Sequence, residues 1–125
     1  MPPSRRVLVA DGDAVVRAAL RLLLARNPYF RVVAEADSLE ALRRDTVSVQ
    51  PDLVLLDMDL RDLLPDELAR ICHSSATVLL STREEQRQAA LASGAAAFVC
   101  KSESPTQLLS VLQTVATVAQ PSASA

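Results

Sequence analysis

The chain has 125 residues, half of them apolar, and its 13 basic and 15 acidic residues leave a formal net charge of −2. This length suits one domain with a core of its own, and the balanced charge excludes a general attraction to nucleic acid or anionic lipid. No apolar run approaches the roughly 20 residues of a membrane span, and the N-terminal stretch is too short for a signal peptide. We expect a cytoplasmic protein that contacts neither nucleic acid nor a membrane directly.

Five short apolar runs divide the chain and are typical of β-strands. The third run, residues 53–56, is wholly apolar, which indicates a central strand buried on both faces. The second run, residues 30–34, carries a charge and indicates an edge strand. The expected strands cover residues 7–10, 30–34, 53–56, 78–80 and 97–100.

Helical patterns fill the intervals between these runs. Their starts carry residue types that favour helix N-termini, namely side chains with a capping oxygen and prolines in the first turn. Gly94 is a suitable C-terminal residue for the fourth helix. The expected helices begin after Asp13 and Ser38, at Pro65, at about Glu84 and at Ser104.

This strict alternation of strands and helices predicts an α/β fold with a parallel sheet covered on both faces. Right-handed crossovers limit the order of the strands. For five strands we adopt the order 2-1-3-4-5 of flavodoxin-like folds, which gives a doubly wound, three-layer sandwich. We expect a single domain over residues 1–119, and a disordered tail or the start of a linker at residues 120–125.

Polar residues stand at the carboxyl ends of four expected strands. They are Asp11, Asp57, Ser81 and Lys101. In a doubly wound sheet, ligands bind at this edge where the strand order reverses, here between the first and third strands. We therefore expect two carboxylates, a hydroxyl and an ammonium group to converge.

Such a set of groups suits phosphoryl transfer to a carboxylate. An aspartate with a pKa near ~4 is already ionised at neutral pH and needs no general base. It needs cancellation of the repulsion from the anionic phosphoryl group, which a divalent cation on oxygen ligands and a lysine supply. A hydroxyl can then hydrogen-bond the attached group and act as a switch.

With these residues in place, the chain resembles the response-regulator receiver family of two-component signalling, from residue 6 to about residue 119. A further segment, Val32-Val33-Ala34-Glu35-Ala36, resembles the subgroup that often precedes a helix-turn-helix output domain, which implies transcription regulation by a longer protein. The segments that carry the family resemblance are Val7-Leu8-Val9-Ala10-Asp11, Pro51-Asp52-Leu53-Val54-Leu55-Leu56-Asp57-Met58, Gly94-Ala95 and Phe98-Val99-Cys100-Lys101.

The resemblance implies a phosphorelay switch in which a histidine kinase or phosphotransfer protein phosphorylates Asp57. It implies that Ser81 is the switch hydroxyl and Phe98 the switch aromatic, and that Lys101 is the lysine of the motif. The Mg²⁺ ligands that it implies are the carboxylates of Asp11 and Asp57 and the backbone carbonyl of Asp59, with Asp13 as an additional candidate.

The chain departs from the family pattern at the metal ligands. Gly12 stands where the family usually has a second acidic residue that binds the metal, and Arg61 replaces a usual proline. Losing a carboxylate removes both a ligand and a negative charge, so we expect weak Mg²⁺ binding and impaired phosphorylation. The stretch after Ser81 is also about two residues shorter than usual, which makes Thr82 a rival for the hydroxyl role and predicts a shifted or truncated fourth helix.

Two alternative functions are open on the sequence. The first is a receiver-like protein–protein interaction module that works without phosphate, which Gly12 and Arg61 favour. The second is an aspartate-nucleophile phosphatase, because Asp57 and Asp59 resemble the haloacid-dehalogenase motif. The chain lacks the following Gly-Thr-like pair, and its only acid after Lys101 is Glu103. We therefore expect no enzymatic activity beyond self-phosphorylation and dephosphorylation at Asp57.

The fifth helix has a broad apolar stripe. Besides its inward residues it carries Leu109 and Val118. This pattern indicates either a well-covered core or a homodimer surface near the fifth helix.

Overall fold

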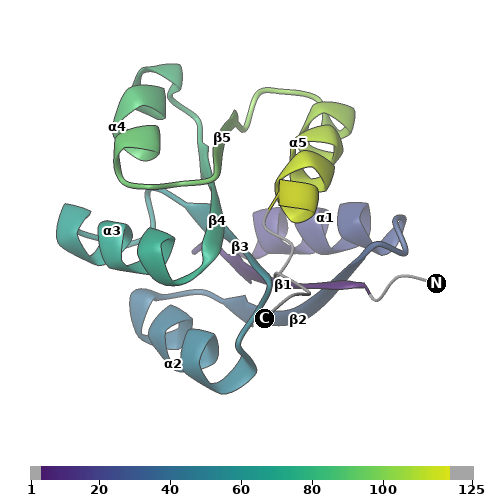
Figure 1. The fold of residues 1–125 in the computed structure, drawn as a ribbon, viewed down its shortest axis with the longest axis horizontal. Helices are drawn as coiled ribbons and strands as arrows, with labels where there is room; N and C mark the ends of the chain where they lie inside the picture. The colour runs from purple at the N-terminus through teal and green to yellow at the C-terminus, as the bar shows by residue number, and fades with distance from the viewer. Residues whose placement is uncertain (1–3, 119–125) are drawn as a thin grey trace.

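The structure is a computed structural model that describes residues 4–118 (Figure 1). The tail expected at residues 120–125 lies outside this range. The elements in chain order are β1 (Arg5–Ala10), α1 (Ala14–Ala25), β2 (Phe30–Ala36), α2 (Leu39–Val49), β3 (Leu53–Asp57), α3 (Pro65–Ser74), β4 (Ala76–Ser81), the 3₁₀ helix η1 (Glu84–Gln86), α4 (Arg87–Ala92), β5 (Ala97–Cys100) and α5 (Pro105–Val118).

The five strands form one parallel sheet in the order β2-β1-β3-β4-β5. Helices α1 and α5 cover one face of the sheet, and α2, α3 and α4 cover the other (Figure 1). The predicted doubly wound, three-layer sandwich is confirmed. The order in which the chain adds strands to the sheet reverses between β1 and β3, so the carboxyl ends of these two strands flank the point at which a ligand can enter.

The central strand β3 explains how one sequence segment serves two cores. All five of its residues are buried. Neighbouring residues along a strand point to opposite faces of the sheet, and helices cover both faces. Leu53 and Leu55 pack with α1 and α5, whereas Val54 and Leu56 pack with α2, α3 and α4. The continuous apolar run therefore reflects burial on both faces.

The helix boundaries follow local signals in the sequence. Asp13 Oδ1 accepts a hydrogen bond of 2.9 Å from the backbone N–H of Val15, and Ser38 Oγ accepts one of 3.1 Å from Ala41. Each bond satisfies a backbone donor that the helix leaves free. After α4, Gly94 has φ of +95°, a left-handed conformation that favours glycine.

The fourth helix and the fourth strand differ in their bounds from the prediction. Helix α4 has six residues and follows a single 3₁₀ turn, whereas one helix was expected from about Glu84. Strands β1 to β4 each extend one to three residues beyond the predicted bounds. Strand β4 was expected at residues 78–80 but covers Ala76–Ser81, and the backbone carbonyl of Ser81 accepts a 2.7 Å hydrogen bond from Lys101 N–H. None of the helices in the described part of the chain has the length and apolarity to cross a bilayer.

Candidate functional site

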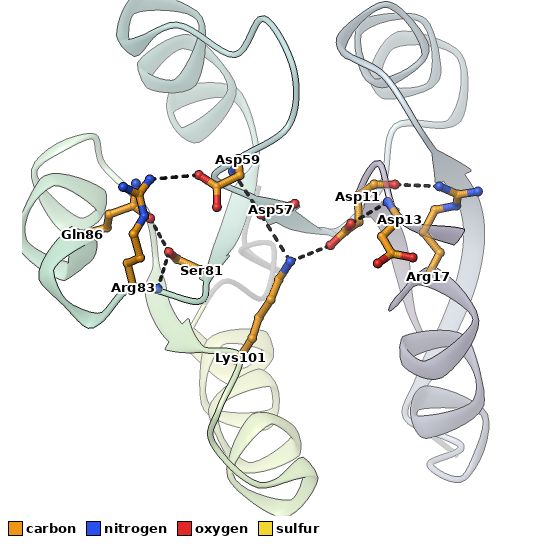
Figure 2. Close-up of polar contacts among 9 residues, drawn as sticks. All are labelled: Asp11, Asp13, Arg17, Asp57, Asp59, Ser81, Arg83, Gln86 and Lys101. Atoms are coloured by element: carbon orange, nitrogen blue, oxygen red, sulfur yellow. Dashed lines mark hydrogen bonds and ion pairs between the residues drawn. The ribbon is translucent and has the colours of Figure 1, made fainter. Parts of the chain in front are cut away.

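An ion-paired cluster occupies the carboxyl edge of the sheet. Asp11 follows β1, Asp57 ends β3 and Lys101 follows β5. The Lys101 ammonium lies 3.0 Å from Asp11 Oδ2 and 3.3 Å from Asp57 Oδ1 (Figure 2). Three of the four groups that the strand order predicted to converge are therefore in contact, although their residues come from distant parts of the chain.

Burial controls the electrostatics of this cluster. Asp11 is 1% exposed and Asp57 is 7% exposed. Burial raises the pKa of the Asp57 carboxyl above its ordinary value, and the negative charge of Asp11 raises it further. The hydrogen bond from the Asp59 N–H and the contact with Lys101 lower this pKa, but the net shift is upward. For Lys101, burial lowers the pKa, but the hydrogen bond to Asp11 and the charge of Asp57 outweigh it, and the net shift is upward. Lys101 therefore stays cationic at neutral pH.

Backbone and side-chain contacts hold Asp11 in place. Its Oδ1 accepts a hydrogen bond of 2.9 Å from the Asp13 N–H, while Oδ2 faces Lys101. The Arg17 guanidinium donates to the Asp11 carbonyl oxygen at 2.7 Å. Both carboxylate oxygens of this buried residue are thus satisfied, as burial of a charge requires.

The other acids of the site are directed elsewhere. The Asp59 N–H donates to Asp57 Oδ1 at 3.0 Å, but its carboxylate pairs with Arg83 at 3.1 Å. Asp13 uses Oδ1 to cap α1, and Gly12 has no side chain. Within residues 4–118, no group of three or more His, Cys, Asp or Glu side chains is arranged to hold a metal ion. The carboxylates of Asp11 and Asp57 are hard oxygen donors that fit a divalent cation, but they are fewer than a tightly held cation uses.

The two candidate hydroxyls have different surroundings. Ser81 is fully buried; its Oγ donates to Gln86 Oε1 and accepts a 2.9 Å bond from Arg83 N–H. Figure 2 shows Ser81 turned toward Gln86 and the Arg83 backbone. Thr82 is exposed and lines an open cavity of ≈ 940 Å³ that Asp57 and Lys101 also line. The expected convergence of the Ser81 hydroxyl with the carboxylates is therefore not seen in this conformation.

The predicted switch aromatic is buried beneath an arginine. Phe98 is 4% exposed, and the Arg87 guanidinium lies 4.8 Å from the centre of its ring. Arg87 also donates to the Phe98 carbonyl at 3.3 Å and pairs with Glu84 and Glu103. This cation over an aromatic face connects the start of α4 to β5.

Sequence reasoning missed three residues that surround the site. Arg83, Gln86 and Arg87 contact Asp59, Ser81 and Phe98 respectively. All three lie in a polar stretch at residues 83–87, directly after β4. That charge-rich stretch was the available signal, since the carboxyl end of a strand beside a site is where functional loops begin.

Comparison with known proteins identifies the family. The response regulator receiver domain family matches residues 7–113, so the chain belongs to it. The chain is 34% identical over 103 residues to the protein-glutamate methylesterase/protein-glutamine glutaminase 2 of Cereibacter sphaeroides (77% of this chain and 28% of that protein). It is 35% identical over 66 residues to the sensory transduction protein LytT of Bacillus cereus (53% and 27%). The chain thus spans about a quarter of the length of these relatives.

Solved structures share the fold. The response regulator domain of CheB from Thermotoga maritima superimposes with a TM-score of 0.78 at 22% identity, over 94% of this chain and 98% of that one. A LuxR-family two-component response regulator from Aurantimonas sp. SI85-9A1 gives 0.84 at 23% identity, over 92% and 86%. The chain is a receiver domain of the response-regulator family, a family of phosphorelay switches. Receiver domains of this family interact with histidine kinases or phosphotransfer proteins.

These relatives correct one expectation. The sequence predicted a chain that is not an enzyme, yet the relatives from Cereibacter sphaeroides and Geobacter sulfurreducens are protein-glutamate methylesterases and protein-glutamine glutaminases. The prediction was wrong because it judged the chain only by the catalytic motifs within it. A receiver domain can be part of an enzyme whose catalytic residues lie elsewhere.

Proposed function

We propose that Asp57 is the phosphoacceptor of this receiver domain and that its phosphorylation is impaired by weak Mg²⁺ binding. The observation that carries the proposal is the contact of the Lys101 ammonium with both Asp11 and Asp57. A buried carboxylate beside a fixed cation is suited to attack an anionic phosphoryl group. The partner is a histidine kinase or phosphotransfer protein, and the setting is the cytoplasm.

The transfer requires a nucleophile and charge compensation. An oxygen of the Asp57 carboxylate forms a bond to phosphorus as the bond from phosphorus to the histidine nitrogen of the donor breaks, and the histidine nitrogen keeps the electron pair. Lys101 lies 3.3 Å from Asp57 Oδ1 and offsets the added negative charge. Mg²⁺, when bound, would supply further compensation. Its ligands would be the Asp11 and Asp57 carboxylates and the Asp59 carbonyl, with the carboxylate of Asp13 as an additional candidate.

The metal affinity is expected to be low because of Gly12. Asp11 and Asp57 supply carboxylates, but Asp59 is paired with Arg83 and Asp13 caps a helix. The site therefore offers less negative charge than the family pattern does. Lys101 adds a positive charge that competes with a cation for the same carboxylates.

The alternative is a phosphate-independent interaction module. The contact that favours it is the hydrogen bond between Ser81 and Gln86, which occupies the hydroxyl. In this alternative, the ion pairs of Lys101 serve only to hold the edge of the sheet together. Transcription regulation, inferred from residues 32–36, requires an output domain or partner in either case.

A phosphate-mimic experiment separates the two functions. The protein is incubated with acetyl phosphate, or with beryllofluoride and Mg²⁺, and is followed by intact mass and NMR. The proposal predicts slow gain of one phosphoryl group and shifts of the Asp57 and Lys101 amides at high Mg²⁺, both abolished in Asp57→Asn. Unchanged mass and spectra at saturating reagent would refute phosphoacceptance and leave the interaction module.

An apolar groove supports a homodimer or partner surface near α5. A cavity of ≈ 550 Å³ runs between α1 and α5. Its rim carries Val15 and Leu22, which are 76% and 66% exposed, while Leu109 packs against the core. The exposed apolar surface beside α5 thus comes from α1, and the side chain of Val118 lies outside the described residues. We propose no direct contact with nucleic acid or membrane. Sedimentation that shows a monomer at high concentration would refute the homodimer.

A further inference from the structure

The hydroxyl of Ser81 has no free hydrogen-bonding proton in this conformation. A serine hydroxyl carries one donor, and Ser81 gives it to Gln86 Oε1. The same oxygen accepts the Arg83 N–H at 2.9 Å. Because the side chain is fully buried, no water can take the place of a lost partner at low cost.

The segment that supplies Gln86 is held at both ends. Arg83 pairs with Asp59 at 3.1 Å, which ties the start of the segment to the loop after β3. Arg87 covers Phe98 and donates to its carbonyl, which ties the end of the segment to β5. Gln86 lies between these two anchors and is therefore presented to Ser81 by contacts with two neighbouring strands.

We propose that Gln86 is a positioning residue that holds the Ser81 hydroxyl away from Asp57, and that a phosphoryl group on Asp57 must compete with Gln86 for the hydroxyl proton. The inference rests on the proposed function of Asp57. A phosphoryl oxygen is a charged acceptor and forms a stronger hydrogen bond than a neutral amide oxygen. Transfer of the Ser81 hydrogen bond from Gln86 to the phosphoryl group is therefore favourable, but it releases less free energy than bonding by a hydroxyl without a partner would.

Two substitutions at Gln86 have opposite expected effects. Gln86→Leu removes the acceptor at similar size and frees the hydroxyl, so the affinity for beryllofluoride rises by about 2- to 10-fold, the range of one net hydrogen bond. Gln86→Glu replaces the amide with a charged acceptor, so the affinity falls. Glu85→Leu is the matched control because Glu85 is an exposed neighbour in the same turn, and it leaves the affinity near that of the wild type.

The double variant with Ser81→Ala tests whether Gln86 acts through the hydroxyl. Affinities are measured by NMR titration with beryllofluoride at fixed Mg²⁺, with circular dichroism as the check on folding. The expected result is that Gln86→Leu has no effect once Ser81 is alanine. A gain that persists in the Ser81→Ala background, or a Gln86→Leu affinity equal to that of Glu85→Leu, overturns the proposal.

The outcomes also separate this inference from the proposed function. Binding by the wild type without any effect at Gln86 refutes the inference alone and points to Thr82 as the hydroxyl. Binding by Gln86→Leu but not by the wild type supports both. Absence of binding in every variant refutes phosphoacceptance at Asp57, and the role of Gln86 falls with it.

Discussion

Introducing an acid at residue 12 is the most direct test of the proposal that a missing carboxylate weakens Mg²⁺ binding. A Cβ atom added at Gly12 would meet the Asp37 carbonyl oxygen at 3.8 Å as its nearest neighbour, which is ordinary van der Waals contact, and Gly12 has no left-handed φ. The residue is exposed and adjoins Asp11. Gly12→Asp is therefore accommodated without strain and adds a carboxylate beside the existing pair.

The gain in affinity follows from the added charge. At about 4 Å, one carboxylate attracts a doubly charged ion by about 2 kcal/mol even at the dielectric constant of water. This free energy corresponds to about a 30-fold lower Kd for Mg²⁺. Without metal, repulsion costs about 1 kcal/mol for each of the carboxylates of Asp11 and Asp57 that lies at about 4 Å, and the loss of glycine flexibility in the unfolded chain offsets about 0.4–1 kcal/mol of that cost.

The assay is a Mg²⁺ titration followed by NMR shifts, with thermal unfolding in EDTA and in Mg²⁺. Gly12→Asn is the matched control because it has the shape of aspartate without the charge. We expect Gly12→Asp to bind Mg²⁺ tightly, and wild type and Gly12→Asn to bind it weakly. Equal affinity of the two variants, or ordinary receiver-like affinity in the wild type, would refute the argument that the missing carboxylate limits binding.

Three further predictions concern stability and reactivity. Burial and the charge of Asp11 raise the pKa of the Asp57 carboxyl in the folded protein. The folded state therefore binds this proton more tightly than the unfolded state does, and its stability falls as the pH rises above the unfolded pKa near ~4. Asp57→Asn in EDTA at pH 7 should therefore have a higher melting temperature than the wild type, and an equal or lower calorimetric midpoint would contradict this. In α1, Leu24 is 0% exposed and Leu22 is 66% exposed. In urea unfolding, Leu24→Ala should lower the free energy of unfolding by about 2–5 kcal/mol, and Leu22→Ala should lower it by less than about 0.5 kcal/mol. Similar losses in the two variants would refute the assignment of the buried helix face. Burial raises the pKa of the Cys72 thiol, and a hydrogen bond with Thr77 opposes this shift. In a Cys100→Ser background at pH 8, Cys72 should therefore react with a thiol reagent more slowly in the folded protein than in urea. Equal rates would contradict the burial of Cys72.

The order of the strands and helices along the chain, and the edge of the sheet that carries the site, could be predicted from the sequence. Apolar runs at residues 53–56 and at the other strands mark segments that must be buried, and capping residues mark the helix starts. Parallel strands bring their carboxyl ends to one edge whatever side chains they carry. Asp11, Asp57 and Lys101 could therefore be assigned to one cluster from the sequence, whereas the missing ligand at Gly12 stays a prediction implied by the family resemblance.

The directions of the side chains around that cluster depend on tertiary contacts and could not be predicted from the sequence. The direction of the Ser81 hydroxyl depends on Gln86, and the position of Gln86 depends on contacts of Arg83 and Arg87 with other strands. Likewise, the exposed apolar surface lies on α1 beside α5, because Leu109 is used by the core. Such outcomes are set by competition among partners distant in sequence, whereas hydrophobic periodicity reports only which face of each element is buried.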